Sequence, residues 1–285
     1  MQESLTPPPE PNWMNEHPKA RWLATSRTTG AAAVGFVVLV VVLVAVVLVR
    51  SGDSGDTAPA AAPPVTAAPS SAPVIPGAEG GFGPSIADPF GREIAVPVDE
   101  QGQVLPQTDP GDRPAFVKDV PVPAPSGMMW QRIGATVAPF STSDGPTRIE
   151  GRLAYGFART PQGAALAGWQ VTARMLRTGD DVREAYARQV VADEGREQTA
   201  MAALAAAGES DFRTGKALFF PEAFKVTSFN DDATFAIVRY ATPLGDGTFS
   251  AGQISLIWTD EQWKVRDTAA PPTSTISSLA GWTRW

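Results

Sequence analysis

One uninterrupted apolar run limits what this chain can fold into more than any other feature. Residues 31–49, AAAVGFVVLVVVLVAVVLV, carry no charge and no side-chain hydrogen-bonding group. An α-helix of that length spans about 30 Å, the thickness of the hydrocarbon core of a bilayer. A cleaved signal peptide is the alternative, but its apolar core is only about 7 to 15 residues long. We therefore expect an uncleaved transmembrane helix over residues 31–49, in contact with membrane lipid.

The charges beside this run set the expected orientation. Lys19, Arg21 and Arg27 precede it, and only Arg50 follows it directly. Short flanking segments rich in Lys and Arg stay on the cytoplasmic side. We therefore expect a single-pass protein of the plasma membrane, with a cytoplasmic tail over residues 1–30 and the remaining mass outside.

Residues 50–126 have the composition of a Pro/Ala-rich, acidic linker. Residues 51–80 consist mainly of Ala, Pro, Gly and Ser, which bury too little apolar surface to offset the entropy of ordering. We expect a disordered stalk, with a small hairpin over residues 92–107, where apolar residues alternate on both sides of a Gly-containing turn. Most of the net charge of −7 falls in the linker, and no segment has the basic surface of a nucleic-acid-binding protein.

An extracytoplasmic domain is expected over residues 127–285. Its first clear pattern is the period-two alternation of residues 147–157, which predicts a strand. The segment GFARTPQGAALAGWQ then poses a choice between a ligand-cradling loop and a helix start. Thr160 suits an N-cap and Pro161 the first helical position, whereas a phosphate loop would need more glycines and a lysine. We expect a helix.

Apolar residues at helical spacing extend this helix until Gly179, with Arg174 and Arg177 in its last turn. Ala165 and Gly168 give it a small-residue edge, where another backbone can approach closely. A second helix is expected from about Asp181. Its apolar stripe consists of Val182, Tyr186 and Val190, and Gly195 interrupts it.

The rest of the domain is strand-like. Four runs are separated by NDD, LGDG and TDE, which are turn sequences; the runs are residues 223–229, 233–242, 248–258 and 262–267. Strands joined by short turns form an antiparallel meander. We expect an α+β domain in which two helices pack on one face of the meander.

Two resemblances add to this reading. The helix pair, the meander and the closing IWTDEQWKV resemble the cystatin-related cone of the nuclear-transport-factor-two-like superfamily. Behind one N-terminal span, that fold is typical of assembly proteins of conjugative, type IV secretion-like machines. More narrowly, PFSTSDGPTRIEGRLAYGFARTPQGAALAGWQ (139–170) is similar to a stretch in uncharacterised single-span proteins of high-GC Gram-positive bacteria, often linked with integrative conjugative elements. The strand over 147–157 departs from the cone pattern.

Catalytic residues are hard to find in this sequence. The chain has no Cys, and its single His, His17, falls in the cytoplasmic tail, so we expect no catalytic site, metal or cofactor outside. The acidic pairs at 180–181 and 231–232 fall at expected caps or turns, where Asp bonds locally. Ser141, Ser143 and Asp144, in STSDGP, indicate a turn rather than a nucleophile.

A curved sheet covered by helices can enclose a pocket. Tyr155, Tyr240 and Arg239 are the polar residues that would line it, although the tyrosines suit a core or interface equally well. Trp282 and Trp285, near the C-terminus, would anchor a partner or dock on their own domain.

Three hypotheses follow. The first is a non-enzymatic scaffold or assembly component of a conjugative transfer apparatus that contacts other envelope proteins, or itself, without binding nucleic acid directly. The second is an extracytoplasmic ligand-binding or sensory module with a cone-shaped pocket. The third is a cone-fold isomerase or dehydratase, which requires a buried carboxylate beside a cavity.

Overall fold

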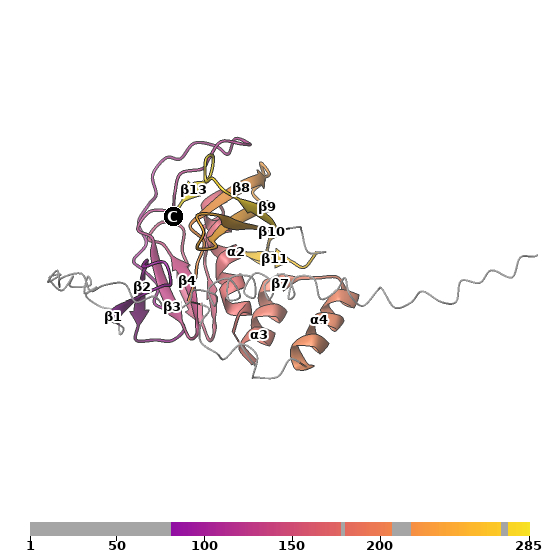
Figure 1. Cartoon of the computed structure of the whole chain (residues 1–285). Helices are drawn as coiled ribbons and strands as arrows, with labels where there is room; N and C mark the ends of the chain where they lie inside the picture. Colours follow the sequence, from indigo (N-terminus) through magenta and orange to yellow (C-terminus); the bar gives the residue numbers. More distant parts are fainter. Residues whose placement is uncertain (1–80, 178–179, 207–217, 269–272) are drawn as a thin grey trace, which may run out of the picture.

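The computed structural model describes residues 81–177, 180–206, 218–268 and 273–285 (Figure 1). They form a mixed α+β fold with two principal sheets, one short hairpin and three helices. Within these ranges no helix is both long enough and apolar enough to cross a membrane. The expected cytoplasmic tail and transmembrane helix, and the linker as far as residue 80, lie outside the described residues.

The first sheet is built partly from residues that we expected in the linker. It has the order β1-β2-β3-β4. Its strands are β1 (Phe82–Ala87), β2 (Glu93–Pro97), β3 (Met129–Ile133) and β4 (Thr136–Phe140). The pairs β1–β2 and β3–β4 are antiparallel, whereas β2 and β3 are parallel. The hairpin expected over 92–107 is wrong, because β2 pairs with β1 and β3 and no strand follows it before residue 107.

The expected linker over 50–126 therefore does not extend through residues 81–126. Besides the two strands, which bury Ile94, this segment places the side chains of Leu105 and Val122 in the core. These apolar residues are widely spaced and follow no helical or strand period. The folded domain, rather than a local pattern, supplies the surface that buries them.

The meander is confirmed. It runs through β8 (Ala223–Phe229), β9 (Phe235–Pro243), β10 (Phe249–Thr259) and β11 (Gln262–Arg266), all antiparallel neighbours. Asp260 and Glu261 have φ values of 51° and 57°, as a two-residue type I′ hairpin requires. Three short strands extend this sheet: β7 (Val190–Val191) beside β11, β12 (Ser274–Ile276) on β10 and β13 (Thr283–Arg284) beside β8.

The helix start is also confirmed. α2 spans Pro161–Met175, and the Thr160 side chain accepts a hydrogen bond of 3.0 Å from the Gly163 N–H. Two further helices follow, α3 (Asp180–Gln189) and α4 (Glu194–Ala206). Val190 was expected on the second helix and instead begins β7, where it pairs with Val265. β-Branched residues such as Val190 and Val191 favour a strand, and their pairing with β11 makes them one.

α2 lies between the two sheets, which the sequence did not predict (Figure 1). It contacts β4 on one side and the strands of the meander on another, and it also contacts α3. Every residue from Gln162 to Met175 is buried. The expectation of two helices on one face of one sheet is therefore wrong, since α3 packs mainly against α2. Four Ala and two Gly within α2 allow both sheets to approach its backbone closely.

The strand expected over 147–157 is a small hairpin. β5 (Arg148–Glu150) and β6 (Leu153–Tyr155) pair antiparallel around Gly151, whose φ is 58°. A left-handed residue in the middle of the run favours a turn over a continuous strand. Alternation held only in part, because all three residues of β6 are buried.

Candidate functional site

A surface hollow of about 350 Å³ opens where α2 begins. Three segments line it: residues 113–116 with Val122, which we call the arm, residues 159–162 at the start of α2, and residues 229–231 at the end of β8. The hollow lies where the start of α2 meets the end of β8. The chain brings these segments together over more than 100 positions, so the site exists only in the folded protein.

The polar side of the hollow is organised by Asp144, which is almost fully buried. The Arg113 guanidinium donates to both carboxylate oxygens, at 2.6 and 2.8 Å. Ser143 Oγ donates to one oxygen at 2.6 Å and Thr160 Oγ1 to the other at 2.9 Å. A carboxylate has about four acceptor sites. Asp144 is therefore saturated, and it holds the arm against the N-cap of α2.

The turn that presents Asp144 uses its serines structurally, as the sequence predicts. Ser141 Oγ accepts hydrogen bonds from the backbone N–H groups of Ser143 and Asp144, at 3.0 and 3.2 Å. Ser143 Oγ also accepts from the Ser126 N–H at 2.8 Å. These bonds fix the turn and tie the backbone of Ser126 to it, so both hydroxyls serve the structure of the turn.

Arg159 supplies the remaining cation. Its Nε donates to the carbonyl of Ala233 at 2.9 Å and its Nη2 to the carbonyl of Asp232 at 2.6 Å. The guanidinium carbon lies 5.4 Å from the centre of the Trp258 ring. Within the described ranges Arg159 has no ion pair, and its Nη1 makes no hydrogen bond. Its side chain is thus oriented by two neutral carbonyls and keeps its charge and two N–H donors free.

The opposite side of the hollow is apolar. The rings of Phe116 and Phe229 are 6.0 Å apart and inclined by 58°. Both are half-buried, and Val122 beside them is buried. Asp231 lies exposed at the rim. The hollow thus combines a fixed cation with aromatic surface.

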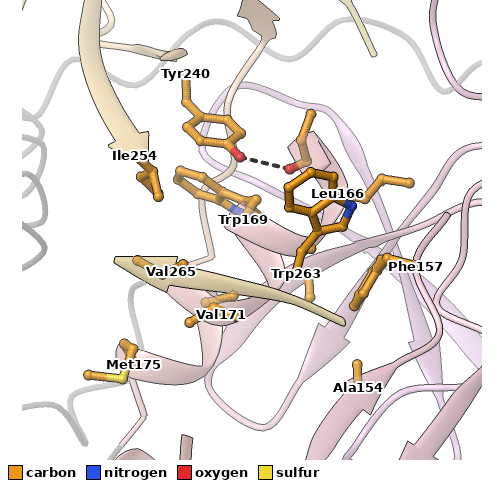
Figure 2. Packing of buried hydrophobic residues seen from close by; sticks show 14 of the residues in the cluster. Ala154, Phe157, Leu166, Trp169, Val171, Met175, Tyr240, Ile254, Trp263 and Val265 are labelled. Carbon is orange, nitrogen blue, oxygen red and sulfur yellow. Dashed lines mark hydrogen bonds between the residues drawn. The ribbon is translucent and has the colours of Figure 1, made fainter. Parts of the chain in front are cut away.

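The three residues proposed to line a cone-shaped pocket do not converge. Tyr240 points to α2, where its hydroxyl donates to the Ala165 carbonyl at 2.8 Å (Figure 2). Burial raises the pKa of Tyr240 well above its ordinary value. Arg239 lies on the opposite face, bonded to Ser274 Oγ and stacked against Trp282. Tyr155 belongs to the β5–β6 hairpin, beside Arg148. Figure 2 shows Trp169, Leu166 and Trp263 packed in the space below Tyr240.

The acidic pairs lie where the sequence predicted, one at the start of α3 and the other on a turn. Asp180 pairs with Arg183, while Asp181 bridges Arg152 and Arg177. The other pair, residues 231–232, lies exposed on the β8–β9 turn. Asp231 lines the hollow, whereas Asp180 and Asp181 do not. The described ranges hold no group of three or more His, Cys, Asp or Glu residues arranged to bind a metal.

Sequence reasoning missed Arg113 and gave Arg174 an incomplete role. Arg113 stood in a Pro-rich stretch with no periodic context, so nothing local marked it. Arg174 was expected to complement the helix dipole, but it is fully buried and donates to the carbonyls of Arg152 and Gln101. Burial, and then the nearby Arg177, lower the pKa of Arg174 to about 9. It links α2 to two loops rather than to a site.

The two C-terminal tryptophans behave differently. Trp285 docks on its own domain, with its ring 4.3 Å from Phe224 and 5.5 Å from Trp130. Trp282 is half-exposed, and its described ring contact is with Arg239. Trp285 therefore belongs to the packing of the fold.

Comparison with known proteins gives a family and no functional relative. The model of a domain of unknown function, DUF8175, matches residues 95–284. No curated protein and no solved structure matches the chain. The match begins within β2, so the family includes the arm and most of the first sheet.

Proposed function

Because the chain belongs to the DUF8175 family, whose description assigns no activity, we propose that it is a membrane-anchored extracytoplasmic scaffold. It acts through protein–protein contacts as an assembly component of a conjugative, type IV secretion-like DNA transfer apparatus. The apolar run over 31–49 anchors it in the plasma membrane, with the tail in the cytoplasm and the α+β domain outside.

The filled interior of the meander carries this proposal. A cone-fold enzyme or a cone-shaped ligand site needs space on the inner face of the sheet. Here α2 occupies that face, and the Tyr240 hydroxyl is held by the Ala165 carbonyl. The inner residues Val238, Leu256 and Val265 are fully buried. The domain thus offers its outer surfaces, rather than an interior cavity, for interaction.

The hydrogen bonds at the hollow also favour a scaffold over an enzyme. The third hypothesis requires a buried carboxylate beside a cavity, and Asp144 occupies that position. Four donors already engage its two oxygens. A general base needs a free acceptor within reach of the substrate proton. Asp144 is better suited to fastening the arm.

Cross-linking in intact cells tests the proposal. Cells that express the full-length protein with a C-terminal tag are treated with a membrane-impermeant amine cross-linker, which reaches exposed Lys118 and the half-buried Lys225 and Lys264 only if the domain lies outside. We expect the protein in the membrane fraction, joined to components of the transfer apparatus or to itself. Tagged residues 1–80, whose single lysine, Lys19, falls in the proposed cytoplasmic tail, serve as the control for nonspecific linking. Recovery of the full chain as an unlinked protein, or from the soluble fraction, would contradict the proposal.

The hollow supports a second candidate function, an extracytoplasmic ligand-binding or sensory module. Its ligand would occupy the surface hollow instead of a cone interior. A thermal-shift screen of small carboxylates and amino acids against the full-length protein tests this function. A rise in Tm that disappears in Arg159→Gln supports it, and a flat screen counts against it.

A further inference from the structure

We propose that the hollow between the arm, the start of α2 and the end of β8 is a docking site for a peptide segment of a partner protein that carries an Asp or Glu beside a large apolar residue. This inference rests on the scaffold function proposed above and names the chemistry of the contact. The carboxylate of the partner binds Arg159, and its apolar neighbour packs on Phe116 and Phe229.

The charges around the hollow identify the acidic part of this ligand. Two arginines line the hollow, but Arg113 is neutralised by Asp144 at 2.6 Å. Arg159 has no carboxylate within ion-pair distance in the part of the chain that the structure describes, and its Nη1 donors are free. Charge-assisted hydrogen bonds from a guanidinium to a carboxylate are short and about twice as strong as neutral ones. A carboxylate is thus the group that complements this site.

Two acidic residues belong to the turn that Arg159 contacts, Asp231 and Asp232. Both are exposed, and Asp232 contacts Arg159 through its backbone carbonyl rather than its carboxylate. Solvent screens their repulsion of an incoming carboxylate. The net charge of −7 disfavours a nucleic-acid backbone, which carries many negative charges, more than it disfavours a single carboxylate.

The geometry of the hollow identifies the apolar part of this ligand. Arg159 is held by the carbonyls of Asp232 and Ala233 and lies against Trp258, so little side-chain freedom is lost on binding. The Phe116 and Phe229 rings provide aromatic surface within the same hollow. Arginine and aromatic side chains dominate the energetics of protein interfaces. A fixed cation beside half-buried rings suits an acidic and apolar pair on a peptide.

A display selection tests the proposal with the full-length protein. Phage-displayed random 12-residue peptides are selected on the tagged protein in detergent micelles. We expect enriched peptides to carry Asp or Glu beside a large apolar residue. Arg159→Gln should weaken their binding roughly 10-fold or more, because a charge-assisted hydrogen bond is lost.

Two variants keep the result interpretable. Arg266→Gln removes an exposed arginine of β11 that does not line the hollow and should leave binding unchanged. Phe116→Ala should weaken binding through the apolar half while leaving the Arg159 contacts in place. Unchanged thermal unfolding of Arg159→Gln shows that its effect is on binding and not on folding.

Three results would overturn the proposal. The first is the absence of any enriched motif, and the second is an enriched motif that Arg159→Gln binds as tightly as wild type. The third is that free 3-phenylpropionate binds in the hollow as tightly as the selected peptides do. This result would mark the hollow as a small-molecule site. Cross-linking separates the two proposals: partners that remain attached to Arg159→Gln refute this docking site and leave the scaffold function standing.

Discussion

The Tyr240 hydroxyl lies 2.3 Å from the position that a Cβ atom at Gly168 would occupy. Tyr240 crosses from β9 to α2, and its hydroxyl donates to the Ala165 carbonyl at 2.8 Å, one helical turn before Gly168. Only a residue without a side chain permits this approach. The contact brings the meander against α2 and removes the space that a cone-shaped pocket would need.

Gly168→Ala should therefore destabilise the protein. Glycine to alanine in a helix interior gains about 1 kcal/mol from propensity, whereas overpacking a buried site costs about 1–3 kcal/mol. We expect a net loss of about 1 kcal/mol in the free energy of unfolding, measured by urea titration of Trp fluorescence. Tyr240→Phe in the same background should recover part of the loss, because it removes the clashing oxygen. A Gly168→Ala variant more stable than wild type would show that the contact is not tight.

Removal of Arg113 should loosen the arm. Arg113→Met leaves the buried Asp144 carboxylate without its counter-ion, and breaking a buried ion pair costs about 3 kcal/mol. We expect a lower Tm and faster tryptic cleavage after exposed Lys118, which lies in the same segment of the chain. The matched control is Arg148→Met, whose pair with Glu150 is half-exposed and should contribute less than about 1 kcal/mol. Equal effects of the two variants would contradict a buried role for Asp144.

Alkaline pH should unfold the domain in one step, and the ionisation of the tyrosines should accompany that step. The chain has three tyrosines, Tyr155, Tyr186 and Tyr240, and burial raises the pKa of each; a hydrogen bond to Asp267 raises the pKa of Tyr186 further. The unfolded chain loses the tyrosine protons near pH 10, whereas the folded chain keeps them. The contribution of the buried tyrosines to the free energy of unfolding is therefore complete below about pH 10. It falls above pH 10 by about 1.4 kcal/mol per pH unit for each tyrosine.

Absorbance at 295 nm, which detects tyrosinate, measures this directly. We expect no signal while Trp fluorescence stays native, followed by one steep rise that coincides with unfolding. Tyrosines that titrate near pH 10 in the folded protein would contradict the burial of their hydroxyl groups.

The C-terminal tryptophans should differ in their effect on stability. Trp285→Ala removes ring contacts with Trp130 and Phe224, and we expect a loss of about 2 kcal/mol for this half-buried side chain. Trp282→Ala removes a surface contact with Arg239 and should cost less than about 1 kcal/mol. Urea unfolding of the two variants, side by side, makes the comparison. A larger loss of unfolding free energy in Trp282→Ala than in Trp285→Ala would contradict this assignment.

Local sequence patterns predicted the elements whose signals are local. The N-cap Thr160 with Pro161 marked the start of α2, and turn residues between alternating runs marked the meander. The turn at STSDGP was also predicted from its local sequence. Such signals succeed because capping, turn geometry and strand alternation involve neighbours a few residues apart.

The sequence by itself thus determined the meander and the start of α2, and it predicts the membrane segment at 31–49. Only the tertiary structure decided that α2 lies between two sheets, that residues 81–126 belong to the fold, and that the hollow forms. Asp144 meets Arg113 from 31 positions away, and Arg159 meets the β8–β9 turn from more than 70. Contacts over such separations depend on how the sheets and α2 pack, and no local period in the chain records them.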